Sequence, residues 1–529
     1  MLLSELVRVM AARTAATVRG GTPPELVRVC DITEDSRTVV PGSLFIARGG
    51  LKADGRKFVA DAITGGAVAV MTDDPSLTID DPRIPLVVCP DIMLATAVGA
   101  EAFYGNPSRA LSLFGVTGTN GKSTTTYLAW KLLNAHDRRC GLIGTVIIDD
   151  GREVARAMMT TPPSIELSRT FASMVECGCV AASMEVSSHA LDQQRCAAFA
   201  FKVGAFTNLT GDHLDYHKTM DNYGAAKARL FEMLPAEGLA VVNANDPASE
   251  RMVRDCKAPV LRCRLGPGPV GEHDATVEIL SRSMRGMGLR LRGPWGDLES
   301  HVDLIGDYNA MNTLQAVAGC FALGLTGADL HAALPSLDAP PGRLQRVSDD
   351  DSDVPVFVDY AHTDDALANV LQAVGRVIPG RTHASAAVKD AAGADRAREE
   401  IGRLWVVFGC GGDKDRTKRP RMGKAAAELA DVVVVTSDNP RSERPGQIID
   451  EVLGGVPPAL RSKVTVQADR GRAIEHAIRE AGPRDVVVLA GKGHENTQIL
   501  SDGKGGLVTI SFDDAEVARR CLAERDGGS

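Results

Sequence analysis

A glycine-rich loop within residues 113–130, LFGVTGTNGKSTTTYLAW, carries residue types that could bind the phosphates of a nucleotide. The usual spacing of such loops would require glycine at Val116, whereas this chain has its glycine two positions later, at Gly118. In such a loop, backbone N–H groups and the dipole of the following helix face the phosphates. Lys122 would reach the terminal phosphates, and the Ser123 hydroxyl could ligate Mg²⁺. The loop alone does not identify the kind of nucleotide enzyme.

The segments on either side of this loop provide the setting that a phosphate site needs. LSLFGV (111–116) is typical of a buried strand, and STTTYLAWKLL (123–133) begins a helix. A loop between a strand and a helix directs several N–H groups and the helix N-terminus toward one point. We therefore prefer a phosphate loop to the alternative, a chance Gly-Lys-Ser turn.

Breaks in regular structure divide the chain into three predicted domains. YGNPSRAL (104–111) and LDAPPGR (337–343) contain the prolines and glycines typical of linkers. Between and beyond them, apolar runs alternate with helical stretches, which indicates an α/β fold. We predict a small N-terminal α/β domain at 1–107, a central P-loop-type ATPase domain with a mostly parallel sheet at 108–339, and a C-terminal Rossmann-like α/β domain at 340–529.

Residues able to do chemistry follow the predicted strands closely. Glu185 follows the apolar run VAAS, His213 comes shortly after GAFTNL, and four strands of the C-terminal domain end in polar, glycine-rich turns. Ligands of open α/β sheets bind outside the carboxyl ends of the strands. The Glu185 carboxylate could ligate Mg²⁺ alongside Ser123. Mg²⁺ prefers oxygen ligands, so from the residues alone His213 could equally be a structural histidine.

Composition excludes several functional classes. The 529 residues are 44% hydrophobic and 24% charged, as in an ordinary protein with several cores. A net charge of −9 with only three tryptophans and six tyrosines disfavours nucleic-acid binding. The first twenty residues lack the apolar core of a signal peptide, and no run of roughly 18 apolar residues predicts a membrane span. Eleven cysteines without metal-ligand spacing predict free thiols in a reducing cytoplasm.

Motifs along nearly the whole chain resemble those of the Mur ligase family, the ATP-dependent enzymes that add amino acids to the UDP-linked peptidoglycan precursor. TGTNGKST resembles the family's phosphate loop. Within the family, the pattern most resembles the members that add meso-diaminopimelate to UDP-MurNAc-L-Ala-D-Glu through an acyl phosphate. The other motifs occur in the expected order: DSR (35–37), ADGRKF (53–58), TTP (160–162), MEVSSHALDQQR (184–195), TNLTGDHLDYH (207–217), YGAAKARLF (223–231), GDYNAMNTLQA (306–316), PGRLQRV (341–347), VDYAHT (358–363), FGCGGDKDRTKRP (408–420), SDNPRSERP (437–445) and GKGHE (491–495).

This resemblance implies a metal site and a modified lysine. Ser123, Glu185 and His213 would ligate Mg²⁺. Lys227 would carry a CO₂-derived carbamate, which turns a cation into a carboxylate-like ligand or orienting group for a second Mg²⁺. A lone lysine on a helix is usually a solvated charge, so the role of Lys227 depends wholly on the resemblance. The implied catalytic set is Lys122, Glu185, His213 and Lys227.

The resemblance also implies contacts to ATP and to the UDP-sugar peptide. Asn309 and Asn312 would face the adenine, Asp359 the ribose and Arg343 the phosphates, in addition to the loop residues Gly118, Thr119, Asn120, Gly121, Lys122, Ser123 and Thr124. Ser36 would contact the uridine diphosphate, with Leu51, Lys52 and Ala53 nearby. The muramoyl-peptide contacts would be Thr160, Thr161, Ser187, Gln193 and Arg195.

The motif DNPR (438–441) resembles the signature of ligases that add meso-diaminopimelate, which differs from lysine by one extra carboxylate. Arg441 could bind that carboxylate with two N–H groups, and Glu495 would pair with an ammonium. Lys414 stands where a carboxylate-binding arginine is usual. It keeps the positive charge but cannot form the two parallel hydrogen bonds of a guanidinium. The expected diaminopimelate contacts are Lys414, Asp438, Asn439, Pro440, Arg441, Gly491 and Glu495.

Two further departures and three alternatives remain. Asp364 replaces the usual proline and could loosen its turn, and an insertion at 381–400 could alter the approach to the C-terminal site. L-lysine is an alternative substrate. A folylpolyglutamate-synthetase-like ligase would lack the N-terminal UDP-sugar domain and the DNPR element, and a nucleotide switch would need no amino-acid pocket. We expect a monomer that acts in the cytoplasm with ATP, meso-diaminopimelate and UDP-MurNAc-L-Ala-D-Glu, without nucleic acid.

Overall fold

The structure is a computed structural model, and it describes residues 1–50, 54–268, 271, 273–350, 352–378, 381 and 402–526. Leu51, Lys52 and Ala53 lie outside these residues, as do residues 382–400 of the expected insertion. The chain divides into two compact units, the first made of Met1–Arg264, Val270–Ala275 and Gln315–Leu330, and the second of Leu265–Pro269, Thr276–Leu314 and His331–Ser529. The division into three domains at the linkers stays a prediction.

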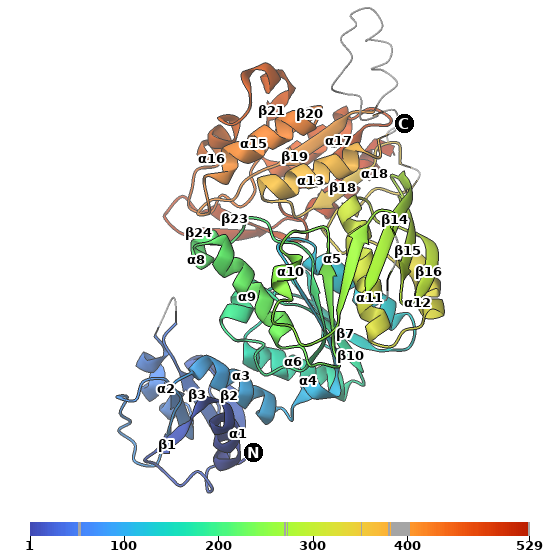
Figure 1. Ribbon diagram of the computed structural model, residues 1–529. Coiled ribbons are helices and arrows are strands. Elements are labelled where there is room, and N and C mark those ends of the chain that lie inside the picture. The colour runs from blue at the N-terminus through green and yellow to red at the C-terminus, as the bar shows by residue number, and fades with distance from the viewer. Residues whose placement is uncertain are drawn as a thin grey trace, which may run out of the picture. The chain divides into compact units, whose positions relative to one another are not determined.

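The first unit begins with a five-stranded sheet in the order β1-β5-β4-β3-β2, drawn in blue in Figure 1. β2 to β5 are parallel, and β1 pairs antiparallel with β5. Leu3, Leu6 and Met10 recur at helical spacing and bury one face of α1 against the sheet. The elements are α1 (Leu3–Thr14), β1 (Thr17–Arg19), β2 (Asp31–Thr33), η1 (Ser36–Thr38), β3 (Ser43–Ala47), η2 (Gly55–Phe58), α2 (Val59–Thr64), β4 (Ala69–Thr72), β5 (Leu86–Val88) and α3 (Ile92–Phe103).

The first unit also contains strands in the order β13-β12-β11-β6-β10-β7-β8-β9. The pairs from β13 to β7 that the structure records are parallel, which agrees with the mostly parallel sheet predicted from the apolar runs. The elements are α4 (Pro107–Ala110), β6 (Ser112–Thr117), α5 (Lys122–Asn134), β7 (Cys140–Ile143), β8 (Ile147–Asp149), β9 (Val154–Arg156), α6 (Ser164–Glu176), β10 (Ala181–Glu185), α7 (Ser188–Asp192), β11 (Phe201–Phe206), α8 (Leu214–His217), α9 (Met220–Glu232), β12 (Leu239–Asn243), α10 (Ser249–Met252) and β13 (Val260–Leu265).

An antiparallel meander of β14 (Asp274–Ser283), β15 (Gly286–Gly293) and β16 (Gly296–Val302) was not predicted. Two-residue links between successive strands leave room only for hairpins, so the strands cannot run parallel. Gly286 has φ +137°, and a Cβ there would lie 2.1 Å from Val302 O, so glycine is required. The meander is followed by α11 (Asp307–Ala322), α12 (Gly327–Ala333) and η3 (Leu334–Ser336).

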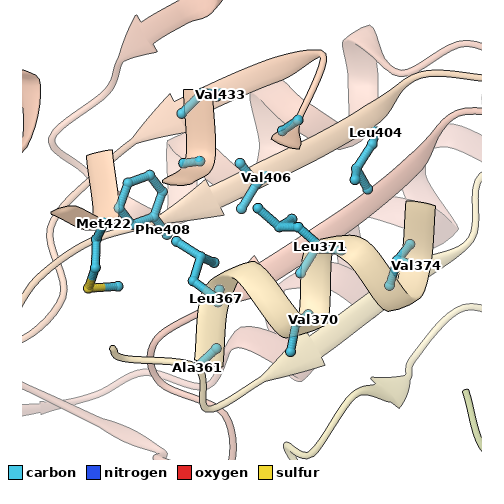
Figure 2. Packing of buried hydrophobic residues seen from close by; sticks show 14 of the residues in the cluster. Ala361, Leu367, Val370, Leu371, Val374, Leu404, Val406, Phe408, Met422 and Val433 are labelled. Atoms are coloured by element: carbon cyan, nitrogen blue, oxygen red, sulfur yellow. The ribbon is translucent and has the colours of Figure 1, made fainter. Parts of the chain in front are cut away.

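The C-terminal part of the second unit is a sheet in the order β17-β18-β22-β19-β20-β21, parallel except for β17. Figure 2 shows Leu367, Leu371 and Val374 of α13 packed toward Phe408, Val406 and Leu404 of β19. The elements are β17 (Gln345–Arg346), β18 (Val356–Asp359), α13 (Asp364–Gly375), β19 (Leu404–Phe408), α15 (Lys418–Leu429), β20 (Val432–Val435), α16 (Pro445–Leu453), η4 (Pro458–Lys463), β21 (Val464–Val466), α17 (Arg470–Glu480), β22 (Val486–Ala490), β23 (Thr497–Ser501), β24 (Leu507–Ser511) and α18 (Asp514–Asp526).

Two expectations from composition can be compared with the fold. All eleven cysteines are free thiols, as expected. Among the residues that the structure describes, no helix combines the length and the apolar character needed to cross a bilayer.

The turn at Asp364, which the sequence suggested could be loosened, is closed by a hydrogen bond: Thr363 Oγ1 accepts from Ala366 N at 3.2 Å. Asp364 lies in the first turn of α13, where an acidic residue is favourable.

Candidate active site

The glycine-rich loop joins β6 to α5, as predicted. Gly118 has φ +148°, and a Cβ there would lie 1.8 Å from Thr207 Oγ1, so no side chain fits. Thr119 N donates to Asn208 O at 2.8 Å, and Asn120 N donates to Asn208 Oδ1 at 2.9 Å. The segment that follows β11 therefore fixes the shape of the loop. Asn208 was not among the predicted site residues.

Two lysine side chains meet at the carbonyl of Gly118. Lys122 Nζ donates to Gly118 O at 3.0 Å and to Thr119 O at 2.9 Å, and Lys227 Nζ donates to Gly118 O at 2.7 Å. Lys227 is 1% exposed and lies 4.3 Å from the ring centre of Tyr223. Burial, reinforced by the charge of Lys122, lowers the pKa of Lys227 well below its ordinary value. Lys227 is therefore a buried amine and not the solvated cation that a lone helical lysine usually is.

Glu185 ends β10 and is 1% exposed. Its Oε1 accepts from Thr145 N at 2.6 Å, and its Oε2 accepts from Thr145 Oγ1 at 3.0 Å. Thr145 Oγ1 also lies 3.0 Å from Thr160 Oγ1. Glu185 pairs with Val116 of the neighbouring strand β6, so the carboxylate and the phosphate loop lie at the same edge of the sheet.

Most residues predicted to hold the muramoyl peptide form one hydrogen-bonded group. Ser187 N donates to Thr161 Oγ1 at 3.0 Å, and Arg195 Nη1 donates to Thr161 O at 2.7 Å. Arg195 also donates through Nη2 to Gln193 Oε1 at 2.7 Å. Ser36 lies apart from this group in the chain, in the 3-10 helix η1 that follows β2 of the five-stranded sheet.

His213 precedes α8 in the left-handed conformation, with φ +54°. Its Nε2 lies 3.4 Å from Asp212 Oδ2, and its ring centre lies 4.8 Å from that of His189. Burial lowers the pKa of His213, and the charge of Asp212 opposes this shift. The neutral imidazole, which is the form that binds metals, is therefore favoured.

Among the predicted Mg²⁺ ligands, Glu185 fits the ion in its chemistry. Within the described residues, no three His, Cys, Asp or Glu side chains are grouped as a metal site. The predicted set needs only two such residues, Glu185 and His213, because the others are a hydroxyl and a carbamate. A buried carboxylate at a strand end beside a phosphate loop supplies the oxygen ligand that Mg²⁺ prefers.

In the second unit, the residues predicted for the nucleotide's adenosine end form two groups. Asn309 Nδ2 donates to Ile305 O at 2.8 Å, and Asn312 Nδ2 donates to Asn309 Oδ1 at 3.0 Å. Asp359 accepts from the backbone N–H groups of Leu344 and Ala361 at 2.6 and 2.7 Å. Burial raises the pKa of Asp359 to about 6. The guanidinium carbon of Arg343 lies 4.7 Å from the ring centre of Tyr360.

The residues predicted to bind diaminopimelate follow three adjacent parallel strands, β22, β19 and β20. Gly411 separates the two predicted carboxylate-binding cations. A Cβ on Gly411 would lie 3.1 Å from Arg441 Nη1 and 3.8 Å from Lys414 Cγ. Arg441 itself has φ +52° and donates through Nη1 to Gly412 O at 2.8 Å. The structure therefore brings Lys414 and Arg441 together, although 27 residues separate them in sequence.

Glu495 is partly exposed and joins a largely buried polar network at the same strand ends. Its Oε2 accepts from Asn439 Nδ2 at 2.8 Å and from Lys492 Nζ at 3.2 Å. Lys492 also donates to Thr497 O at 2.6 Å, and Asn439 Oδ1 accepts from Ile499 N at 3.0 Å. Asn439 thus joins the DNPR segment both to the GKGHE turn and to β23.

Comparison with known sequence families identifies the chain. A model described as the Mur ligase middle domain matches residues 116–320, the Mur ligase glutamate ligase domain matches 382–493, and the Mur ligase family catalytic domain matches 29–110. The chain belongs to the Mur ligase family. These three matches cover most of its length, from the N-terminal sheet to the GKGHE turn.

Individual relatives of this Mur ligase are similar over nearly their full length. The UDP-N-acetylmuramoyl-L-alanyl-D-glutamate–2,6-diaminopimelate ligase of Synechococcus elongatus is 43% identical over 501 residues, which cover 94% of each chain. That of Chlorobium phaeobacteroides is 40% identical and covers 100% of this chain and 98% of its own. A solved structure of such a ligase is 29% identical, with a TM-score of 0.67 and 99% of each chain covered. This likeness agrees with the predicted α/β architecture.

Sequence reasoning about this Mur ligase missed several residues that hold the site together. Thr145 follows β7, so the rule that located Glu185 at a strand end could have found it too. Lys492 stands inside the quoted motif GKGHE and could have been considered there. Asn208 and the buried Arg419 also stand inside quoted motifs, but their contacts with distant parts of the chain gave no signal in the sequence.

Proposed function

We propose that this Mur ligase joins meso-diaminopimelate to the D-glutamyl γ-carboxylate of UDP-MurNAc-L-Ala-D-Glu. ATP phosphorylates the carboxylate, the amine of diaminopimelate attacks the acyl phosphate, and ADP and phosphate are released. The observation that carries the amino-acid assignment is that Arg441 and Glu495 both contact Asn439, Arg441 through Nη1 at 3.5 Å from Asn439 O and Glu495 by accepting from Asn439 Nδ2 at 2.8 Å. A cation and an anion held this way match the carboxylate and the ammonium of an amino-acid head group.

The chain's own residues can meet the main difficulty of this reaction, which is that two anions must approach each other. Lys122 leaves the loop carbonyls and binds the γ-phosphate when ATP occupies the loop. Ser123, Glu185, His213 and the carbamate of Lys227 would hold Mg²⁺. The ion would supply the positive charge that neutralises the phosphates and the carboxylate.

The carbamate on Lys227 is supported by the burial of its amine. CO₂ adds to a neutral amine, forms the N–C bond and releases a proton. Burial and the neighbouring charge of Lys122 favour this neutral form. The product is an anion beside the Lys122 cation, whereas a protonated Lys227 would place two cations at the carbonyl of Gly118.

The N-terminal part of the chain favours a UDP-muramoyl substrate over a folate. Residues 29–110 match a Mur ligase model, and the diaminopimelate-adding relatives align over this region too. A folylpolyglutamate-synthetase-like ligase would need no UDP-sugar domain here. Because ATP and a UDP-linked precursor are its proposed substrates, we place the reaction in the cytoplasm, and we propose a monomer.

An amino-acid-dependent phosphate-release assay tests the proposal. The enzyme should release phosphate from ATP only when both UDP-MurNAc-L-Ala-D-Glu and meso-diaminopimelate are present. Replacing diaminopimelate by L-lysine, or the UDP-linked dipeptide by a folate, should leave little activity. A preference for lysine would overturn the amino-acid assignment, and ATP binding without phosphate release under all conditions would favour a nucleotide switch.

A further inference from the structure

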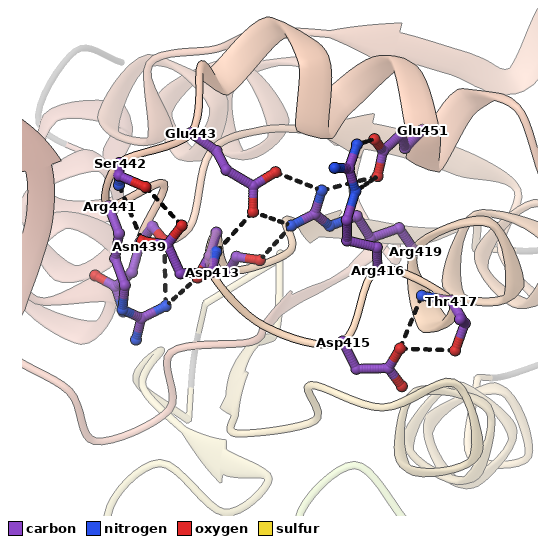
Figure 3. A network of polar contacts seen from close by, with 12 residues as sticks. Asp413, Asp415, Arg416, Thr417, Arg419, Asn439, Arg441, Ser442, Glu443 and Glu451 are labelled. Carbon is purple, nitrogen blue, oxygen red and sulfur yellow. Dashed lines mark hydrogen bonds and ion pairs between the residues drawn. The ribbon is translucent and has the colours of Figure 1, made fainter. Parts of the chain in front are cut away.

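A fully buried arginine joins the two loops that carry the cations of the amino-acid site (Figure 3). Arg419, on α15, has no exposed side-chain surface. Its guanidinium binds Glu443 with both terminal nitrogens, at 2.9 and 2.7 Å, and Nη1 also donates to Glu451 at 2.8 Å. Nη2 donates in addition to Gly411 O at 3.1 Å. Nε has no hydrogen-bond partner among the described residues, so the two carboxylates and the carbonyl at the terminal nitrogens balance this buried charge and hold its position.

Glu443 connects this arginine to the loop of Lys414. Its Oε1 accepts from Asp413 N at 2.6 Å, and the Asp413 carboxylate accepts from Ser442 N at 3.2 Å and from Ser442 Oγ at 2.6 Å. In the other direction, Arg441 donates to Gly412 O at 2.8 Å. The dashed lines in Figure 3 include those from Ser442 to Asp413, from Asp413 to Glu443 and from Glu443 to Arg419.

Both loops also contain a residue whose backbone conformation needs support. Asp413 has φ +54° and Arg441 has φ +52°, in the left-handed region that side chains other than glycine adopt at a cost. Such residues keep this conformation only where surrounding contacts hold them. Asp413 directly precedes Lys414 in sequence, and Arg441 directly precedes Ser442, which binds the Asp413 carboxylate. The ion pairs of Glu443 therefore act on the backbone that directs the two cations.

We propose that Arg419, Glu443 and Glu451 form a positioning cluster that sets the placement of Lys414 relative to Arg441, and thereby the enzyme's preference for an amino acid with two carboxylates. None of the three residues needs to touch the substrate. The inference rests on the proposed function, because it assumes that the two cations receive the carboxylates of diaminopimelate.

The variant Glu443→Gln tests this proposal, because it keeps the size of the side chain and removes its charge. We expect the KM for diaminopimelate to rise about tenfold, with kcat and the KM for ATP changed less than about twofold, since a displaced cation weakens binding without touching the phosphates. The preference for diaminopimelate over L-lysine should fall by a similar factor. Arg419→Lys, which keeps the charge but loses the fork, should act in the same direction.

Asp485→Asn is the matched control. Asp485 is a buried carboxylate paired with Arg403 at 2.8 Å, and Arg403 precedes β19, at the strand end opposite the loop of Lys414. This variant should lower the melting temperature and leave the substrate preference unchanged. If Glu443→Gln behaves like Asp485→Asn, with an unchanged preference for diaminopimelate, the cluster is only structural and the proposal is overturned.

Hydrogen exchange separates this inference from the proposed function. Amides of residues 411–417 and 438–443 should exchange faster in Glu443→Gln than in the unmutated enzyme or in Asp485→Asn. If the unmutated enzyme fails to use diaminopimelate, the proposed function is wrong, whatever the exchange result. If it uses diaminopimelate but exchange in both loops is unchanged by Glu443→Gln, the function stands and the positioning cluster does not.

Discussion

Lys227 should carry a carbamate at neutral pH, because its surroundings favour the uncharged amine that reacts with CO₂. A solvated lysine with a pKa near 10.4 is neutral in only ~0.1% of molecules at pH 7.4. Each unit by which the pKa falls raises this fraction about tenfold until most of the amine is neutral. Lys227 is 1% exposed and shares the carbonyl of Gly118 with Lys122, so its pKa lies well below that of a solvated lysine. The carbamate on Lys227 should therefore form as pH rises, and it should be lost at low pH, where the amine is protonated to an ammonium.

Replacing Lys227 by alanine should remove a ligand or orienting group from the metal site. We expect kcat to fall at least about 100-fold, equivalent to about 2.7 kcal/mol of transition-state stabilisation. Short carboxylic acids such as acetate should restore part of the rate, because the truncated side chain leaves a buried space beside Gly118 where a carboxylate can bind. Lys202→Ala, which removes an exposed lysine from β11, should leave the rate unchanged and show no rescue.

The carbamate can be observed directly by ¹³C NMR with labelled bicarbonate. The unmutated enzyme and Lys202→Ala should show a carbamate resonance that Lys227→Ala lacks, and the resonance should weaken as the pH is lowered. A Lys227→Ala enzyme with a near-normal rate would refute the reasoning. So would an active unmutated enzyme without any resonance that depends on Lys227.

Three further variants test other parts of the site. Arg441→Ala should lower kcat/KM for meso-diaminopimelate by ~10–150-fold, because a charge-assisted contact contributes ~1.5–3 kcal/mol, and it should lower kcat/KM for L-lysine far less. A competition assay checks this: equal incorporation of the two amino acids by the unmutated enzyme would show that the DNPR motif is misinterpreted. Lys122→Ala should abolish phosphate release while circular dichroism stays unchanged, because the γ-phosphate loses its cation. Burial raises the pKa of Asp359 to about 6, so its contribution to the free energy of unfolding should decline as pH rises from about 4 through 6. The melting temperature at pH 7 minus that at pH 4.5 should therefore be more positive in Asp359→Asn than in the unmutated enzyme, and an equal value in both proteins would contradict the shift.

The elements that follow strong local signals were predictable from the sequence. The apolar run 111–116 and the helical stretch 123–133 correspond to β6 and α5, and the strands ending at VDYAH, FGCGG and GKGHE lie side by side as β18, β19 and β22. Each is an apolar run that ends at a polar, glycine-rich turn, so one short segment contains both the pattern and its boundary.

What the sequence could not predict depends on contacts between distant segments. The place of Thr145 at a strand end was visible in the sequence, but its bond to a carboxylate 40 residues away was not. Arg419 likewise binds Glu443 24 residues away. The burial of Lys227 is of the same kind, because nothing in AAKARLF distinguishes a helix face that meets the phosphate loop from one that meets water. Its role could be inferred only from resemblance, whereas the structure adds a physical reason for it.

Charge balance explains why the amino-acid site contains more acidic and basic groups than one ligand requires. Lys492 is fully buried and already donates to Glu495, so a substrate ammonium at Glu495 would bring two cations to one carboxylate. Asp438 supplies the second anion: its Oδ1 lies 3.9 Å from Lys492 and has no hydrogen-bond partner among the described residues. Burial raises the pKa of Asp438, so an arriving ammonium would favour its ionised form. Glu495 and Asp438 together would balance the charges of Lys492 and of one substrate ammonium. The carboxylate of the ligand would then bind Arg441 and Lys414. Both diaminopimelate and lysine carry an ammonium that could bind Glu495 and Asp438, so these two residues would not distinguish the amino acids. The selection would depend on how Arg441 and Lys414 are positioned.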